Sequence, residues 1–303
     1  MISVVDISGY SFSGKSAIFD YLSDFQRSYY FDREFEFDLI RRKNGIHDMK
    51  GSLVSDNWSL IRSSESIREF RKLINYYGDK KNIFTKLFGI GHYYEDKFPN
   101  FKKYGEIYLK NLINGKIESF WPFPYVQKKG FGNLYFKLRN KLGKPKETEI
   151  FLSRISEKEF NLITLEFFNS IFEFLKNTSY KRILLNNAFE TEAPEKSIVF
   201  FENAKSIIVD RDPRDIYISA LLTGKIGGID VGKNVIGNNI YEFINRYKLT
   251  RSKKYNSYKR VLRINFEEFV SEFEITSLRI KEFLEINEDE NNFKNKFDIN
   301  KSL

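Results

Sequence analysis

The chain has 303 residues, a formal net charge of +9, 41% hydrophobic residues and no cysteine. This length is enough to bury a substantial core, and the lack of cysteine excludes disulfides and thiolate metal sites. No apolar run approaches the ~18 residues of a membrane helix, and no secretory signal opens the chain. We therefore expect a soluble, cytoplasmic protein without a transmembrane segment. Basic residues are spread along the chain among acidic ones, so we do not expect nucleic-acid binding.

The first predicted elements are a strand, a loop and a helix within residues 2–25. The strand "ISVVDIS" is almost continuously apolar, as in a strand buried on both faces. The loop fits the pattern G-x-x-x-x-G-K-S, and such loops surround phosphate with backbone N–H groups at a helix N-terminus. We expect a phosphate site formed by Gly9, Ser11, Phe12, Ser13, Gly14, Lys15, Ser16 and Ala17.

Residues 27–41 predict a long strand, "RSYYFDREFEFDLIR". Its Phe residues at alternate positions share one side, while Glu34 and Glu36 lie on the other. A turn-rich loop containing His47 follows. Residues 63–78 then predict a helix with a Ser cap and a terminal Gly.

Residues 79–150 are rich in aromatic residues, Lys and Gly, with short periodic segments. We interpret them as a mainly helical insertion, which is either an acceptor-binding lid or a hydrophobic satellite of the core. Trp121, Phe123 and Tyr125 fit either reading, because aromatic rings stack on sugars and also fill cores.

The last third of the chain alternates predicted strands and helices. Strands are expected within 180–187, 205–212 and 258–266, after a helix within 157–177. This alternation predicts an α/β fold, a P-loop-type parallel β-sheet flanked by helices. We expect one domain over residues 1–303.

A second motif, "SIIVDRDPRDIYISALL", joins a buried strand to a helix. Asp212 is a suitable helix N-cap and Pro213 a suitable first helical residue. Arg211 then lies at the carboxyl end of the strand, where open α/β sheets bind ligands. Ser219 follows eight residues later, so the two side chains can grip one phosphate.

Strand, Arg-Asp-Pro-Arg-Asp and a Ser eight residues after the first Arg resemble the 3′-phosphate site of PAPS-dependent sulfotransferases (PAPS, 3′-phosphoadenosine 5′-phosphosulfate). The glycine loop is similar in position to that family's 5′-phosphosulfate loop. The segment 259–286 resembles its final strand and closing helix. Family members usually carry Lys before the loop Gly, whereas here Phe12 has that place and Lys15 follows Gly14.

The resemblance implies transfer of a sulfuryl group from PAPS to an acceptor hydroxyl, with adenosine 3′,5′-bisphosphate as product and no metal. Lys15 would neutralise charge on the bridging oxygen. Because the family's general base is His or Glu, the candidates are Glu36, Glu34 and His47, with Glu36 preferred. The resemblance implies a small-molecule or glycan acceptor, and a bacterial carbohydrate-type member of the family.

Two other functions fit parts of the sequence. In a P-loop kinase that uses ATP and Mg²⁺ on a small molecule, Asp210 would hold the metal at the end of "IIVD". In a non-catalytic nucleotide-binding protein, the phosphate loop would remain without a base. In the kinase, Arg211 and Arg214 would clamp the γ-phosphate, but a kinase does not account for Asp-Pro-Arg-Asp with the distant Ser219.

Overall fold

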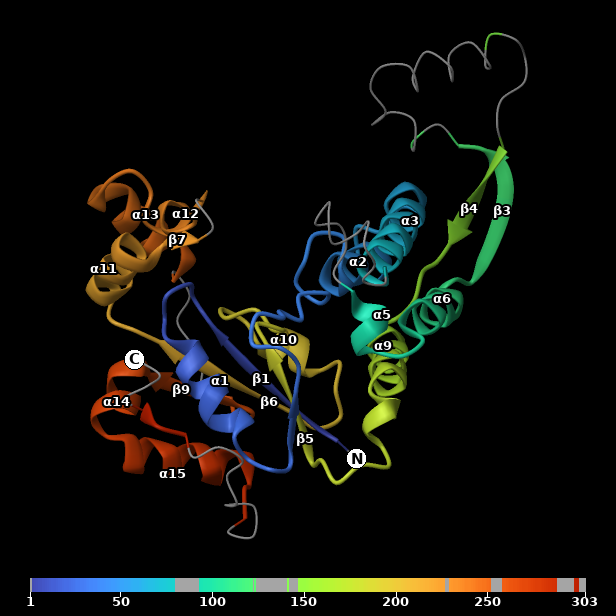
Figure 1. Cartoon of the computed structure of the whole chain (residues 1–303). Coiled ribbons are helices and arrows are strands. Elements are labelled where there is room, and N and C mark those ends of the chain that lie inside the picture. The colour runs from blue at the N-terminus through green and yellow to red at the C-terminus, as the bar shows by residue number, and fades with distance from the viewer. Residues whose placement is uncertain are drawn as a thin grey trace. The chain divides into compact units, whose positions relative to one another are not determined.

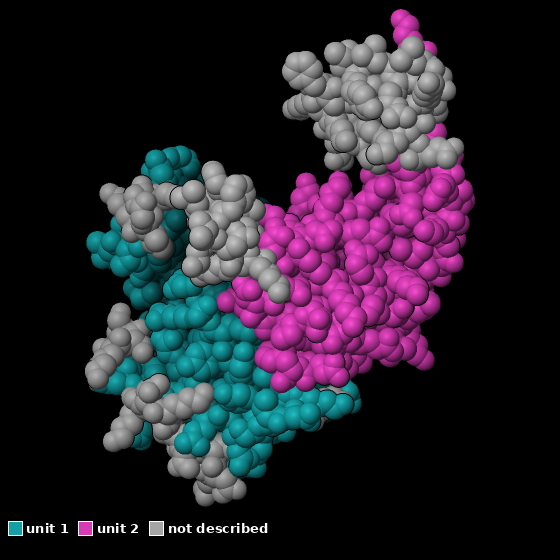
Figure 2. Space-filling model, turned by 45° about the vertical axis from the view of Figure 1, so that its right-hand side comes forward, with its two compact units in different colours: residues 1–38, 175–303 teal, residues 39–174 magenta. Residues whose placement is uncertain are grey.

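The computed structural model describes residues 2–79, 93–121, 123, 141, 147–226, 229–251, 258–287 and 297–299. The chain forms two compact units, coloured separately in Figure 2. Unit 1 comprises residues 1–38 and 175–303, and unit 2 comprises residues 39–174. Unit 2 therefore covers more of the chain than the insertion expected over residues 79–150. Much of that insertion, including Tyr125, lies outside the described residues.

Unit 1 is an α/β structure around a five-stranded sheet in the order β2-β5-β1-β6-β9. Each neighbouring pair of strands is parallel, so all five carboxyl ends lie at one edge. The strands of the sheet are β1 (Ser3–Gly9), β2 (Ser28–Tyr30), β5 (Arg182–Asn186), β6 (Ala204–Asp210) and β9 (Val261–Asn265). The expected P-loop-type parallel sheet is confirmed.

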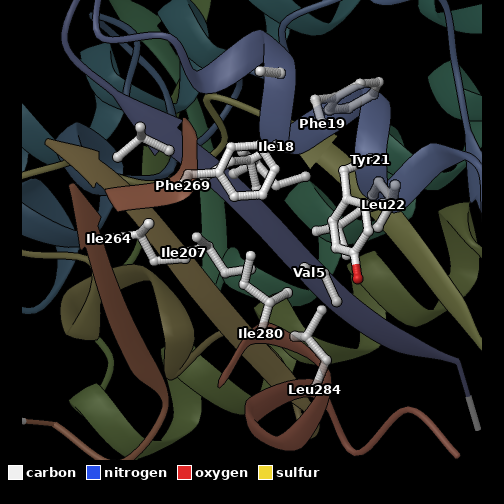
Figure 3. Packing of buried hydrophobic residues seen from close by; sticks show 14 of the residues in the cluster. Val5, Ile18, Phe19, Tyr21, Leu22, Ile207, Ile264, Phe269, Ile280 and Leu284 are labelled. Atoms are coloured by element: carbon white, nitrogen blue, oxygen red, sulfur yellow. The ribbon is translucent and has the colours of Figure 1, made fainter. Parts of the chain in front are cut away.

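The apolar core of unit 1 lies between one face of this sheet and three helices, α1 (Lys15–Ser23), α14 (Phe266–Ser271) and α15 (Phe273–Leu284). Figure 3 shows Ile18 and Leu22 of α1 near Val5 and Ile207 of the strands. Ile18 and Leu22, four residues apart and so on one face of α1, are fully buried. This packing fixes the start of α1, and with it the glycine loop, on the sheet.

Three more helices, α11 (Pro213–Thr223), α12 (Gly232–Ile236) and α13 (Ile240–Thr250), gather together in Figure 1. They share a small apolar cluster around Ile216, Ala220 and Phe243, against which Phe12 of the glycine loop packs. Asp212 caps α11 by accepting from the Arg214 backbone N–H at 2.8 Å, as expected. The other elements of unit 1 are α10 (Glu195–Ile198), β7 (Lys225–Ile226) and β8 (Ile229–Asp230).

The prediction of a long strand over residues 27–41 is wrong. Only Ser28–Tyr30 forms a strand, paired with β5, and a turn at residues 33–34 follows. The chain meets β5 again at a single bridge between Glu36 and Asn186. Phe37 is buried, while the rings of Phe31 and Phe35 contact each other instead of continuing a strand face.

Unit 2 is mainly helical and carries a two-stranded antiparallel sheet. The helix expected over residues 63–78 is confirmed, although its Ser cap is Ser59 and it ends before Gly78. Among the described residues, no helix is both long and apolar enough to cross a membrane. The elements of unit 2 are α2 (Ile46–Leu53), α3 (Leu60–Tyr77), α5 (Tyr94–Lys97), α6 (Phe101–Leu112), β3 (Gly115–Phe120), β4 (Glu147–Leu152) and α9 (Glu157–Ile171), with a 3₁₀ turn, Glu173–Leu175, where the units meet in sequence.

Asp6 of β1 is a buried carboxylate, and because side chains alternate along a strand it lies on the sheet face opposite the core residues Val5 and Ile7. Its Oδ1 accepts the Ser8 hydroxyl at 2.8 Å and the backbone N–H groups of Ala188 and Phe189 at 2.9 and 3.2 Å. Its Oδ2 accepts the Ser206 hydroxyl at 2.6 Å. Burial raises the pKa of Asp6 to about 6, although these hydrogen bonds act in the opposite direction.

We expect Asp6→Asn to remove a pH dependence of stability. Because the folded-state pKa lies above the unfolded value, the contribution of Asp6 is full below about pH 4 and is lost as pH rises through about 6. The free-energy advantage of wild type over Asp6→Asn should fall by about 3 kcal/mol across that window. Urea unfolding followed by circular dichroism between pH 4 and 7 measures it. If the free energies of unfolding of the two proteins change with pH in parallel, Asp6 does not have the raised pKa.

Candidate nucleotide-binding site

The glycine loop joins β1 to α1, and two of its positions require glycine. Gly14, the N-cap of α1, has φ +82°, and a Cβ there would lie 2.3 Å from the Phe266 ring. A Cβ on Gly9 would lie 2.4 Å from Ser13 Oγ and 2.9 Å from the Val209 carbonyl oxygen. No side chain caps the N-terminus of α1, so its first N–H groups can face an anion.

Ser13, inside the loop, is 1% exposed, and its hydroxyl has no hydrogen-bond partner among the described residues. A buried hydroxyl without a partner is costly, so this group suits a ligand that supplies an acceptor. The preceding Phe12 has φ +63°, a conformation that residues other than glycine seldom adopt. Strained backbone of this kind is often found at ligand-binding loops.

Arg211 connects the second motif to the glycine loop. Its Nη1 donates to the Phe12 carbonyl oxygen at 3.0 Å, and its guanidinium lies 4.8 Å from the centre of the Phe266 ring. Its Nε is buried and has no hydrogen-bond partner in the described structure. Arg211 therefore joins the second motif to the glycine loop, and its buried Nε–H group suits a ligand that supplies an acceptor.

Ser219 is half-buried on α11, next to the buried Ala220. Its carbonyl oxygen accepts the Thr223 hydroxyl at 2.8 Å within the helix. The position on α11 two turns after the Asp212 cap is as expected. That Ser219 and Arg211 bind one phosphate stays a prediction.

Lys15 and Glu36 come together at the start of α1. The Lys15 Nζ lies 3.4 Å from Glu36 Oε1, and the same oxygen accepts from the Asn187 side-chain amide at 2.5 Å. The Glu36 side chain is 43% exposed, so an acceptor in solvent can reach it. The structure thus places the preferred base candidate beside the lysine of the glycine loop.

The other two base candidates lie in a turn of unit 1 and in a helix of unit 2. Glu34 is exposed in the turn at residues 33–34. His47 belongs to unit 2, where its backbone N–H donates to the Ile40 carbonyl oxygen at 3.1 Å in the first turn of α2. Trp121 is only 7% exposed, and its indole N–H donates to Glu65 at 2.7 Å. This burial favours core packing over sugar stacking for Trp121.

Sequence reasoning missed two residues of the site, Asn186 and Asn187. Asn186 ends the apolar strand β5 and Asn187 follows it, at the same sheet edge as the glycine loop, and Asn187 has φ +51°. The signal was present, because two amides at the carboxyl end of a buried strand are candidates for a ligand-facing turn. What the sequence lacked was any indication that Glu36 is their partner.

Asp210, the metal ligand in the kinase hypothesis, is already paired with cations. Its Oδ2 accepts from Arg263 at 2.8 Å, and its Oδ1 lies 3.7 Å from an Arg251 guanidinium nitrogen. A Mg²⁺ ion at Asp210 would compete with two arginines for the carboxylate. Arg211 is bonded to the Phe12 carbonyl oxygen of the glycine loop, and no ion pair links it to Asp215 among the described residues.

No protein-family model matches this sequence, and a search of curated proteins finds no significant match either.

Proposed function

We propose that this protein is a sulfotransferase, which moves a sulfuryl group from PAPS to a hydroxyl of a carbohydrate or glycan precursor. The observation that carries the proposal is the hydrogen bond from Arg211 to the Phe12 carbonyl, which joins two phosphate motifs far apart in sequence. One motif would hold the 5′-phosphate and the other the 3′-phosphate. A chain without cysteine suits a reducing cytoplasm, where we place this reaction.

The residues of the loop fit an anionic nucleotide. The uncapped start of α1, the unpartnered Ser13 hydroxyl and the two glycines leave donors and space for a phosphate. PAPS supplies the sulfuryl group and leaves as adenosine 3′,5′-bisphosphate. Lys15 would neutralise the charge that develops on the bridging oxygen as the bond to sulfur breaks.

Glu36 would act as the general base. It accepts the proton of the acceptor hydroxyl while the hydroxyl oxygen forms its bond to sulfur. Its carboxylate lies beside Lys15, so the base and the leaving-group cation are close enough to act on the two ends of one transfer. The partly exposed Glu36 side chain leaves room for an acceptor.

The pairing of Asp210 with Arg263 and Arg251 favours this function over the kinase. In P-loop NTPases an Asp at the end of a buried strand holds Mg²⁺ together with the Ser or Thr of the loop, and here that Asp is paired with arginines. The pair of Lys15 and Glu36 favours an enzyme over a non-catalytic nucleotide-binding protein, because nucleotide binding alone needs no base.

Calorimetry with adenosine 3′,5′-bisphosphate and ADP, with and without Mg²⁺, tests the proposal. We expect tighter binding of the bisphosphate, without any need for Mg²⁺. Arg211→Ala should weaken PAPS binding by about 10- to 100-fold, the effect of one charge-assisted hydrogen bond of roughly 1.5–3 kcal/mol. Binding of adenosine 5′-phosphosulfate, which has no 3′-phosphate, should hardly change.

Arg214→Ala is the matched control, because Arg214 is exposed on the first turn of α11 and is bonded to Asp212. It should leave both affinities near the wild-type values. Equal affinity for the bisphosphate and ADP, or strict dependence on Mg²⁺, would favour the kinase. If Arg211→Ala weakens the binding of PAPS and of adenosine 5′-phosphosulfate equally, Arg211 has a structural role and does not contact the 3′-phosphate.

A further inference from the structure

The segment that carries Glu36 has little regular structure of its own, and β5 holds it in place. The Phe37 backbone N–H donates to the Asn186 carbonyl oxygen at 2.9 Å. The Asn186 side-chain amide donates to the Arg33 carbonyl oxygen at 2.9 Å. These two bonds fix the backbone on both sides of Glu36, and the amide of Asn187 then reaches the Glu36 carboxylate itself.

Hydrogen bonds to residues of β1 hold the turn that carries Asn187. Its backbone N–H donates to the Ile7 carbonyl oxygen of β1 at 3.0 Å. The next two backbone N–H groups, of Ala188 and Phe189, both donate to the buried carboxylate of Asp6. Asn187 adopts φ +51° under these restraints, a conformation that asparagine tolerates better than most residues.

We infer that Asn187 is a positioning residue for the general base, and that Asp6 beneath it fixes the turn from which its amide orients Glu36. The inference rests on the proposed function. The Asn187 amide at 2.5 Å and the Lys15 ammonium at 3.4 Å both contact Oε1 of Glu36. The segment that carries Glu36 is itself irregular. The amide hydrogen bond of Asn187 orients the half-exposed carboxylate of Glu36 more closely than the ion pair with Lys15, which is a weak restraint in solvent.

Two substitutions separate orientation from folding. Asn187→Gly removes the amide and permits φ +51° without strain. Asn187→Asp keeps the size of the side chain and its tolerance of the turn, but places a second carboxylate against Glu36. Asn44→Gly is the matched control, since Asn44 also has positive φ (+63°) and lies in unit 2.

We expect Asn187→Gly to lower kcat by about 10- to 100-fold, the scale of a misplaced catalytic group, with the affinity for adenosine 3′,5′-bisphosphate unchanged. In Asn187→Asp the acid limb of the pH–rate profile should move to higher pH, because a neighbouring negative charge opposes ionisation of Glu36. Asn44→Gly should have wild-type kinetics. A purely structural role would lower the rate equally at every pH.

Carboxyl ¹³C NMR of the full chain, with the Glu36 signal assigned through Glu36→Gln, tests the contact without any turnover. The Glu36 signal should titrate at higher pH in Asn187→Asp than in wild type. If it titrates at the same pH in both proteins, or if both Asn187 variants keep wild-type kcat, the inference is wrong. If wild type neither binds the bisphosphate nor transfers sulfate, the proposed function fails while the NMR comparison still decides whether Asn187 controls Glu36.

Discussion

Glu36→Gln is expected to lower the rate of sulfuryl transfer by about 10²–10⁴-fold, the usual contribution of a general base. Glutamine keeps the volume of the side chain and can still accept the Asn187 hydrogen bond through its amide oxygen, but it cannot take up the acceptor proton. Nucleotide affinity should stay near wild type, because the phosphate contacts assigned to the glycine loop and Arg211 do not involve this carboxylate. Steady-state kinetics with saturating acceptor, together with calorimetry for the bisphosphate, measure both quantities.

The fold should survive this substitution. The Lys15–Glu36 pair is partly exposed, with side-chain exposures of 19% and 43%, and such pairs contribute at most about 1 kcal/mol to stability. Glu34→Gln is the matched control, since it changes an exposed carboxylate two residues away in the adjoining turn. His47→Ala tests the remaining candidate. If Glu36→Gln keeps its rate and one of the others loses it, the base is that residue, and if all three stay active the base lies elsewhere.

The backbone of the glycine loop and of the turn after Asp210 was predictable from sequence because their signals are local. A buried strand, a glycine at a position that needs positive φ, and a helix start within a few residues specify the loop around Gly14. In the same way, Asp212 and Pro213 specify the start of α11, which fixes Arg211 at the strand end. Parallel pairing of β1 and β6 then brings both motifs to one edge of the sheet.

The environment of Glu36 was not predictable, because it depends on where another strand ends. Alternating Phe and charged residues over 31–38 indicated a continuous strand, but β5 offers its last paired position at Asn186. The chain therefore turns at residues 33–34 and returns to β5 only at Glu36. Nothing in the local pattern names β5 as the partner, so the Asn187 contact could be found only in the folded chain.

The bounds of unit 2 were also not predictable, because they too depend on contacts between distant parts of the chain. Composition marked residues 79–150 as different, whereas the compact unit runs from residue 39 to residue 174. Buried aromatic contacts between distant helices hold it together, such as Tyr108 of α6 stacked on Phe167 of α9 at 4.7 Å. Such pairs look like ordinary amphipathic helix faces in the sequence, which do not show what they pack against.

Lys15→Ala is expected to lower kcat for sulfuryl transfer by about 10²–10³-fold, the cost of losing one preorganised group that stabilises transition-state charge. PAPS binding should also weaken, because a cation of the phosphate loop is removed. Lys15→Arg should recover part of kcat by restoring the charge. Lys196→Ala is the control, since it removes an exposed lysine from α10, outside the glycine loop. Unchanged kinetics in Lys15→Ala would exclude Lys15 from the mechanism.

The contact between Lys15 and Glu36 makes a sharper test possible with the double variant Lys15→Ala/Glu36→Gln. If the two groups act on opposite ends of one transfer step, removal of either group abolishes most of the rate enhancement that the other provides. The double variant should then be little slower than the slower single variant. If Lys15 serves only nucleotide binding, its loss should appear in the affinity for the bisphosphate and multiply with the loss caused by Glu36→Gln. Single-turnover kinetics with saturating PAPS distinguish these outcomes, because they remove the binding contribution and leave the chemical step alone.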